Sequence, residues 1–81
     1  AYPSADGKWI LIAANSEPLF ARLSTLIGRP DLPSDAKFAD NRARVANVVE
    51  LDSIIATWTR QLPIEEIEAR LKEADIPSTQ V

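Results

Sequence analysis

Helix-ending residues divide most of this chain into short helical segments. Gly28 and Pro30 form one stop and Pro63 another, because glycine readily takes the left-handed conformation that ends a helix and proline cannot continue one. Around these stops, apolar residues recur every three or four positions, the spacing of one face of an α-helix. The three repeats are Leu19, Phe20, Leu23, Leu26 and Ile27; Leu51, Ile54, Ile55, Trp58 and Leu62; and Ile64, Ile67, Leu71 and Ala74. They predict three amphipathic helices, the first capped by Asn15 or Ser16.

The first 14 residues follow a different pattern. Asp6-Gly7 is a strong signal for a two-residue type I′ hairpin turn, in which both central residues have positive φ. Residues 9–13, WILIA, are apolar throughout, which is typical of a strand covered on both faces. One face would carry Trp9, Leu11 and Ala13, and the other Ile10, Ile12 and Ala14. We expect one domain of the α+β class, a short antiparallel hairpin or sheet packed with three to four α-helices. The helices would cover one strand face and a further part of a longer protein the other.

A mixed, charged segment, SDAKFADNRARVAN at residues 34–47, lies between the first two apolar repeats. Ser34 or Asp35 can cap a single helical turn that carries Phe38 into the core. This segment therefore either forms a binding site or joins two helices.

A helix break is predicted inside the same region. Asp40 can cap a short helix that runs through Val45. Asn47 and Glu50 then fit a capping box, in which the two side chains bond to each other's backbone N–H groups. We therefore end one helix at Asn47 and begin the next there.

Three cations of this region, Lys37, Arg42 and Arg44, are the candidates for binding a phosphate or carboxylate. For the arginines, an ion pair that holds the loop to a helix is the favoured interpretation. For Arg44, we expect a side chain that is at least partly buried and paired, since a guanidinium can make several fixed hydrogen bonds. The candidate partners are Asp31, Asp35, Glu50 and nearby backbone carbonyls.

The composition limits the chemistry that the chain can perform alone. It has no cysteine and no histidine, which excludes disulfides and removes the commonest general base and metal ligand. The carboxylates are scattered at helix caps and surfaces, so we assign no catalytic residue and no metal site. Trp58 is in register with the second repeat, which favours a core position over stacking on a ligand. Both roles stay open for Trp9.

Charge and hydropathy argue against two classes of partner. The net charge is −3, whereas neutralising nucleic acid phosphates requires a basic surface. No apolar run approaches the ~20 residues that span a bilayer. We expect no nucleic acid and no membrane partner, and, without a signal-peptide pattern, a cytoplasmic protein. The chain contains no methionine and opens on AYPSADG, so we expect a piece of a longer protein.

An ordered set of short matches runs through nearly the whole chain. It consists of Tyr2, Asp6-Gly7 and the strand 9–13; Phe20 with Leu23; Leu26-Ile27-Gly28-Arg29-Pro30 and Leu32; Asp35-Ala36-Lys37-Phe38; Arg44, Asn47, Glu50-Leu51 and Trp58; and Leu71, Ala74-Asp75-Ile76-Pro77 and Val81. This order resembles the family III CoA-transferases, which include formyl-CoA transferase, carnitine CoA-transferase and α-methylacyl-CoA racemase. The chain departs from the family pattern at Ala36, at Val48 and at Asp75, where proline, arginine and glycine are usual. Asp75 would then have to end the last helix in place of glycine, since aspartate tolerates the left-handed conformation better than most residues.

The resemblance implies that residues 1–81 are the small, C-terminal-side domain of such an enzyme. The parent enzyme would transfer coenzyme A between carboxylic acids, with a CoA thioester as substrate, in an interlocked homodimer whose small domain covers the active site. The catalytic aspartate would lie in the absent large domain, so the fragment alone would be inactive and bind no cofactor. SDAKFADNRARVAN would be the family's signature loop, anchored by Phe38 and Arg44. The alternative is a mostly helical protein-interaction module with no catalytic role.

Overall fold

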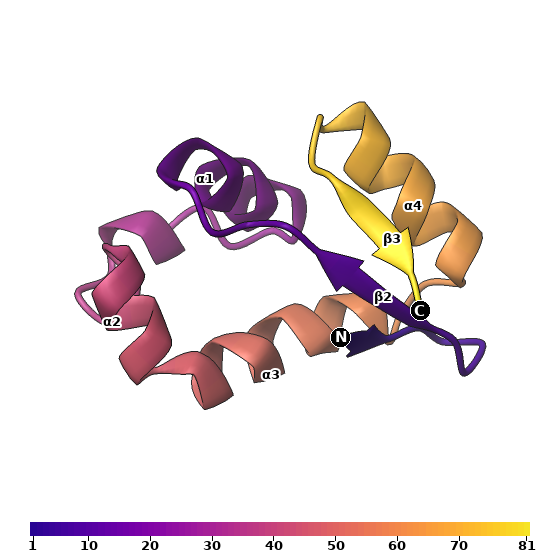
Figure 1. Cartoon of the computed structure of the whole chain (residues 1–81), viewed down its shortest axis with the longest axis horizontal. Coiled ribbons are helices and arrows are strands. Elements are labelled where there is room, and N and C mark those ends of the chain that lie inside the picture. Colours follow the sequence, from indigo (N-terminus) through magenta and orange to yellow (C-terminus); the bar gives the residue numbers. More distant parts are fainter.

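The structure, a computed structural model, describes all residues 1–81 and contains three short strands, four α-helices and one 3-10 helix (Figure 1). The strands are β1 (Tyr2–Pro3), β2 (Trp9–Ile12) and β3 (Ser78–Gln80). The helices are α1 (Glu17–Leu26), the 3-10 helix η1 (Leu32–Ser34), α2 (Asn41–Ala46), α3 (Val48–Thr59) and α4 (Ile64–Glu73). The predicted α+β class, a small antiparallel sheet packed with short helices, is confirmed.

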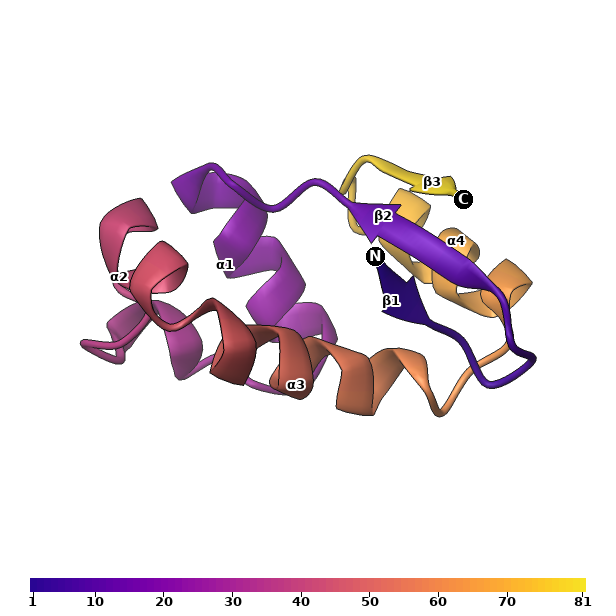
Figure 2. The same ribbon diagram turned by 60° about the horizontal axis from the view of Figure 1, so that its bottom comes forward.

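The middle strand of the sheet is β2, which pairs antiparallel with β1 on one side and with β3 on the other. Tyr2 of β1 and Gln80 of β3 both pair with Ile10, so the two ends of the chain lie on either side of one strand (Figure 2). The β1–β2 hairpin was predicted from its local pattern. The pairing of β3 with β2 joins opposite ends of the chain, and no local pattern indicates it.

The hairpin loop differs from the predicted two-residue turn. Ser4 N donates to Lys8 O at 2.8 Å, which closes a loop of three residues. Gly7 has a φ of 77°, but Asp6 is not in the positive-φ region that a type I′ turn requires of both central residues. The Asp6 carboxylate instead accepts hydrogen bonds from Ser4 Oγ and, at 3.2 Å, from the backbone N of Ile64 at the start of α4. The turn residue therefore also caps a distant helix.

Both ends of α1 follow their local sequence. Ser16, one of the two predicted caps, accepts a hydrogen bond from Leu19 N through its side chain. At the other end Gly28 has a φ of 81°, and Arg29 N donates to Ser24 O at 2.8 Å. This is the Schellman pattern, in which a left-handed residue lets the chain turn back on the last helical carbonyls.

The C-terminal end of α4 makes the same pattern without glycine. Asp75 has a φ of 62° and is the one non-glycine residue with positive φ. Ile76 N donates to Leu71 O at 2.9 Å, and Asp75 N donates to Lys72 O at 3.0 Å. The prediction that Asp75 ends the last helix in place of glycine is confirmed. Ile76 is then buried directly beyond the turn.

The segment between α1 and α2 holds two short turns. The first is η1, which was not predicted and ends at Ser34. The second is the predicted turn that carries Phe38, and Asp35, one of the two predicted caps, caps it by accepting a hydrogen bond from Lys37 N at 2.9 Å. Phe38 N donates to Asp35 O and closes this turn, which places Phe38 in the core with 2% of its surface exposed, as predicted.

The core lies between one face of the sheet and the helices. Ile10 of β2 is fully buried there, and α3 packs beside β1 while α4 packs beside β3 (Figure 1). The buried apolar cluster is Ile10, Phe20, Leu23, Leu32, Phe38, Leu51, Ile55, Ile64, Ile67, Leu71 and Ile76. Trp58 packs against this cluster but is only partly buried, so the predicted core position is confirmed in part. The buried residues of α3 are Leu51, Ile55, Ala56 and Thr59. No helix has the length and apolar character needed to cross a membrane.

Candidate functional site

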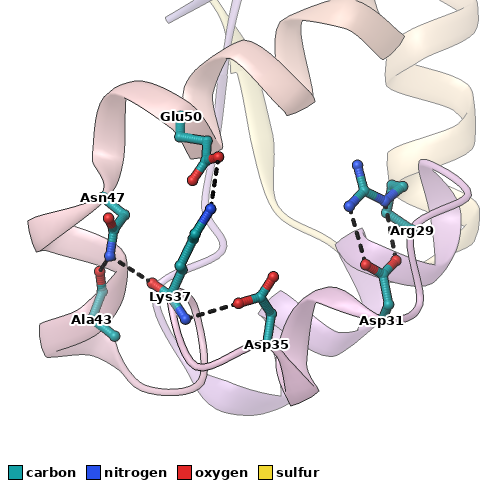
Figure 3. A network of polar contacts seen from close by, with 7 residues as sticks. All are labelled: Arg29, Asp31, Asp35, Lys37, Ala43, Asn47 and Glu50. Atoms are coloured by element: carbon teal, nitrogen blue, oxygen red, sulfur yellow. Dashed lines mark hydrogen bonds and ion pairs between the residues drawn. The ribbon is translucent and has the colours of Figure 1, made fainter.

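The break between α2 and α3 occurs at Asn47, as predicted, but not through a capping box. Asp40 caps α2 by accepting a hydrogen bond from Ala43 N at 2.7 Å. The Asn47 side chain makes no bond to the start of α3. Its Nδ2 atom instead donates to Lys37 O at 3.1 Å and to Ala43 O at 3.0 Å (Figure 3). Asn47 therefore ties the preceding loop to the end of α2.

Two ion pairs lie on the solvent side of this region. Lys37 Nζ lies 3.2 Å from Glu50 Oε1, and Arg29 donates twice to the Asp31 carboxylate, at 3.0 Å each (Figure 3). All four side chains are about half exposed. Arg29 holds the pKa of Asp31 below its usual range, mainly through these hydrogen bonds. The hydrogen bond to Asp31 and the negative charge of the Asp31 carboxylate in turn raise the pKa of Arg29.

A surface hollow of about 720 Å³ adjoins the polar groups of Figure 3. Arg29, Lys37 and Asn47 line it together with Glu50 and the apolar side chain of Val49. The two cations already have carboxylate partners, so an incoming phosphate would have to displace a carboxylate. Nowhere do three or more metal-ligating side chains gather.

Arg44 lies on the buried side of the same segment. Its residue surface is 5% exposed, and its guanidinium stacks over the Phe20 ring at 4.5 Å from the centroid. Nη1 donates to Phe38 O at 3.0 Å, and Nη2 donates to Glu17 Oε1 at 2.8 Å. One side chain thus joins α2 to the start of α1 and to the loop that carries Phe38.

The predicted burial of Arg44 and its backbone carbonyl partner are confirmed, whereas the predicted acidic partners, Asp31, Asp35 and Glu50, are wrong. Asp31 pairs with Arg29 and Glu50 with Lys37, and packing brings Glu17 to Arg44. Glu17 and Phe20 are three residues apart on one helix and lie on the same face, but this spacing does not indicate that Arg44 packs there.

The three candidate anion-binding cations do not form a cluster. Arg44 is enclosed in the core, and Lys37 is paired on the surface beside Asn47. Arg42 is exposed on α2 and has no ion pair. On the inside of this segment, Arg44 connects α2 to α1 and to the Phe38 loop. On the outside, Lys37 belongs to a solvent-exposed network of ion pairs and hydrogen bonds.

A second long-range contact joins the sheet to α3 and was not anticipated from the sequence. Tyr2 Oη donates to Asp52 Oδ1 at 2.7 Å. Burial of the phenol, the hydrogen bond and the Asp52 charge together raise the pKa of Tyr2 far above its ordinary value. The phenol stays protonated and acts as a hydrogen-bond donor that fixes β1 against the helix.

A sequence model of one enzyme family, CoA-transferase family III, matches residues 1–81. This chain belongs to CoA-transferase family III. It is 36% identical over 80 residues to succinyl-CoA–D-citramalate CoA-transferase of Chloroflexus aurantiacus, a match that covers 99% of the chain and 20% of that enzyme. It is also 31% identical over 77 residues to the beta subunit of succinyl-CoA–L-malate CoA-transferase of the same organism.

Solved structures of family members contain the same fold. Rv3272 from Mycobacterium tuberculosis superimposes with a TM-score of 0.90 at 31% identity, over 100% of this chain and 23% of that one. A CAIB/BAIF family protein from Brucella suis superimposes with a TM-score of 0.88 at 34% identity, over 95% and 20%. The chain thus spans about a fifth of the length of the family III relatives that it matches.

Proposed function

We propose that residues 1–81 form the small, C-terminal-side domain of an enzyme that transfers coenzyme A between carboxylic acids, and that this domain covers the active site of a homodimer. The observation that carries the proposal is the family match over the full chain, combined with coverage of only about a fifth of each relative. The CoA thioester is the substrate of the parent enzyme. We place its catalytic aspartate outside residues 1–81.

Five aspartates of the chain take part in structural hydrogen bonds. A carboxylate nucleophile for acyl transfer needs an accessible position close to the thioester. Asp6, Asp31 and Asp52 each accept a hydrogen bond from a neighbouring structural group instead. Asp35 and Asp40 cap turns or helices in the same way. These carboxylates are used to hold the fold together.

The activities that give the relatives their names favour transfer over racemisation. The succinyl-CoA–D-citramalate and succinyl-CoA–L-malate enzymes are both CoA-transferases. Their names also point to succinyl-CoA as a donor and a dicarboxylate as an acceptor to test. The alternative of a helical interaction module has no separate support, because its one feature, an exposed apolar strand face, is equally expected of an enzyme domain.

The test compares a longer polypeptide that contains these residues with the 81-residue chain. Each is incubated with succinyl-CoA and with malate or citramalate, and the CoA thioesters are separated by chromatography. We expect a new thioester from the longer protein and none from the chain alone. Turnover by the chain alone would place a catalytic group within it. If the longer protein inverted the configuration of a 2-methylacyl-CoA when no acceptor was present, its activity would be racemisation rather than transfer.

Binding of coenzyme A provides a second measurement. We expect titration calorimetry to detect no micromolar binding of CoA by the 81-residue chain, because its candidate cations are separated and two of them are already paired. Tight binding that is lost in Lys37→Ala or Arg42→Ala would instead assign the phosphate contacts to this domain.

A further inference from the structure

The two faces of the sheet differ sharply in burial. On the inner face, Ile10 is completely buried by the helices. On the outer face, Trp9 and Leu11 are 50% and 48% exposed. Val81 lies beside Trp9, with its N donating to Trp9 O at 3.0 Å, and is 79% exposed. We call Trp9, Leu11 and Val81 the outer sheet face.

The outer sheet face has the composition of a covered surface. A central strand with large apolar side chains on both sides is characteristic of a sheet that is packed on both faces. The pairing also groups these side chains, because Pro3 of β1 is the direct partner of Trp9. Since cross-strand partners point to the same side of a sheet, Pro3, Trp9 and Val81 form one apolar row across it.

We propose that the outer sheet face is the surface on which the rest of the same family III polypeptide docks; this rests on the proposed function. The relatives are about five times as long as this chain, so a large covalently linked partner is available. Tyr2 and Gln80 flank Ile10, so a polypeptide continuing from either end starts beside this face. A tether of that kind gives a high effective concentration and needs only a small contact.

A second copy of the domain is a poorer occupant of this surface. Stable interfaces between separate proteins use about 20–30 residues on each side. The outer sheet face offers three large apolar side chains and their neighbours, on strands of two to four residues. A patch of this size suits docking within one polypeptide. The covalent link has already removed most of the translational freedom that separate proteins lose when they bind.

Another exposed apolar position provides a matched control. Val45 on α2 is 66% exposed and is not part of the outer sheet face. It lines a hollow with Tyr2 and Ile12, which lie on the inner face of the sheet with Ile10. Threonine has nearly the shape of valine, so Val45→Thr removes apolar surface with little change in shape. Threonine also favours strands, so Leu11→Thr removes apolar surface with little change in strand propensity. Leu11→Thr and Val45→Thr are therefore a matched pair.

Hydroxyl-radical footprinting tests the proposal directly. The 81-residue chain and the longer protein are labelled under identical conditions, and oxidation at each site is quantified by mass spectrometry. We expect a severalfold loss of labelling at Trp9 and Leu11 in the longer protein and no loss at Val45. Equal labelling of Trp9 in the two proteins would overturn the proposal. Protection of Trp9 in the 81-residue chain that grows with its concentration would also overturn it, in favour of a second copy.

Thermal unfolding of the longer protein provides a readout that does not depend on folding of the chain alone. We expect Leu11→Thr and Trp9→Thr to lower its melting temperature by several degrees more than Val45→Thr does. The same small shift for all three variants would contradict docking at this face. The transfer assay tests the proposed function separately, since neither labelling nor melting depends on which reaction is catalysed.

Discussion

The segment that joins α1 to α3 has two sides, and they differ in how their charges are used. On the inner side, Arg44 is nearly inaccessible and contacts Phe38, Glu17 and Phe20 at once. On the outer side, the Lys37–Glu50 pair is about half exposed, as is the pair formed by Arg29 with Asp31. When one partner of a buried charged group is removed, the remaining polar group has neither its partner nor water to bond with, which is costly. When one partner of an exposed ion pair is removed, water solvates the remaining group at little cost. Stability should therefore depend on the inner side far more than on the outer.

The largest effect is expected for the apolar anchor of the inner side. Phe38→Ala would leave a cavity where Phe38 is now 2% exposed, at a cost of about 3–5 kcal/mol. A domain of this length has a total stability of only about 4–12 kcal/mol, so much of the population should unfold. Circular dichroism with urea titration measures this, and Phe38→Leu should recover most of the loss. A free energy of unfolding unchanged in Phe38→Ala would contradict the inner anchor.

The second effect concerns the guanidinium itself. Arg44→Ala should cost about 1–3 kcal/mol, because the Phe38 carbonyl loses its donor inside the protein. Arg44→Lys should recover only part of this, since one ammonium cannot reproduce both hydrogen bonds and the stacking on Phe20. Arg42→Ala, two positions away and exposed, should stay within about 0.5 kcal/mol of the parent chain. Urea denaturation of the three variants is the measurement, and equal effects at both arginines would remove the distinction between the two sides.

An intermediate effect is expected at the boundary between the two sides. Asn47→Ala removes two hydrogen bonds to the carbonyls of Lys37 and Ala43, and should cost about 1 kcal/mol. Asn41→Ala is the control, because Asn41 is exposed at the start of α2 and makes no side-chain bond. Hydrogen exchange should show faster opening at the α2–α3 break in the Asn47 variant alone. Slower or unchanged exchange there would mean that Asn47 does not hold the break.

The smallest effect is expected for the exposed ion pair. A double-mutant cycle on Lys37 and Glu50 should give a coupling of about 0.2–1 kcal/mol that decreases as salt is added. The two positions are 13 residues apart, so the coupling does not arise from helix propensity. Urea denaturation at low and high ionic strength measures it. A salt-independent coupling larger than the cost of Arg44→Ala would reverse the comparison between the two sides.

Features set by neighbours within four or five residues were accessible from the sequence. The cap at Ser16, the left-handed Gly28, the glycine-like role of Asp75 and the break at Asn47 all belong to this class. Their hydrogen bonds connect atoms that the backbone already holds close together, so residue type decides the outcome. The family resemblance came from the same kind of information, an ordered series of short local matches.

Long-range contacts were decided only by the tertiary structure. Glu17 reaches Arg44 across 27 positions, Tyr2 reaches Asp52 across 50, and Asp6 reaches Ile64 across 58. Several acids lie near each cation in sequence, and local spacing does not rank them. The choice depends on which helix faces pack together, and packing is a property of the whole core. For the same reason Trp58 lies at the edge of the core although its spacing matches the apolar repeat, and β3 completes a sheet from the opposite end of the chain.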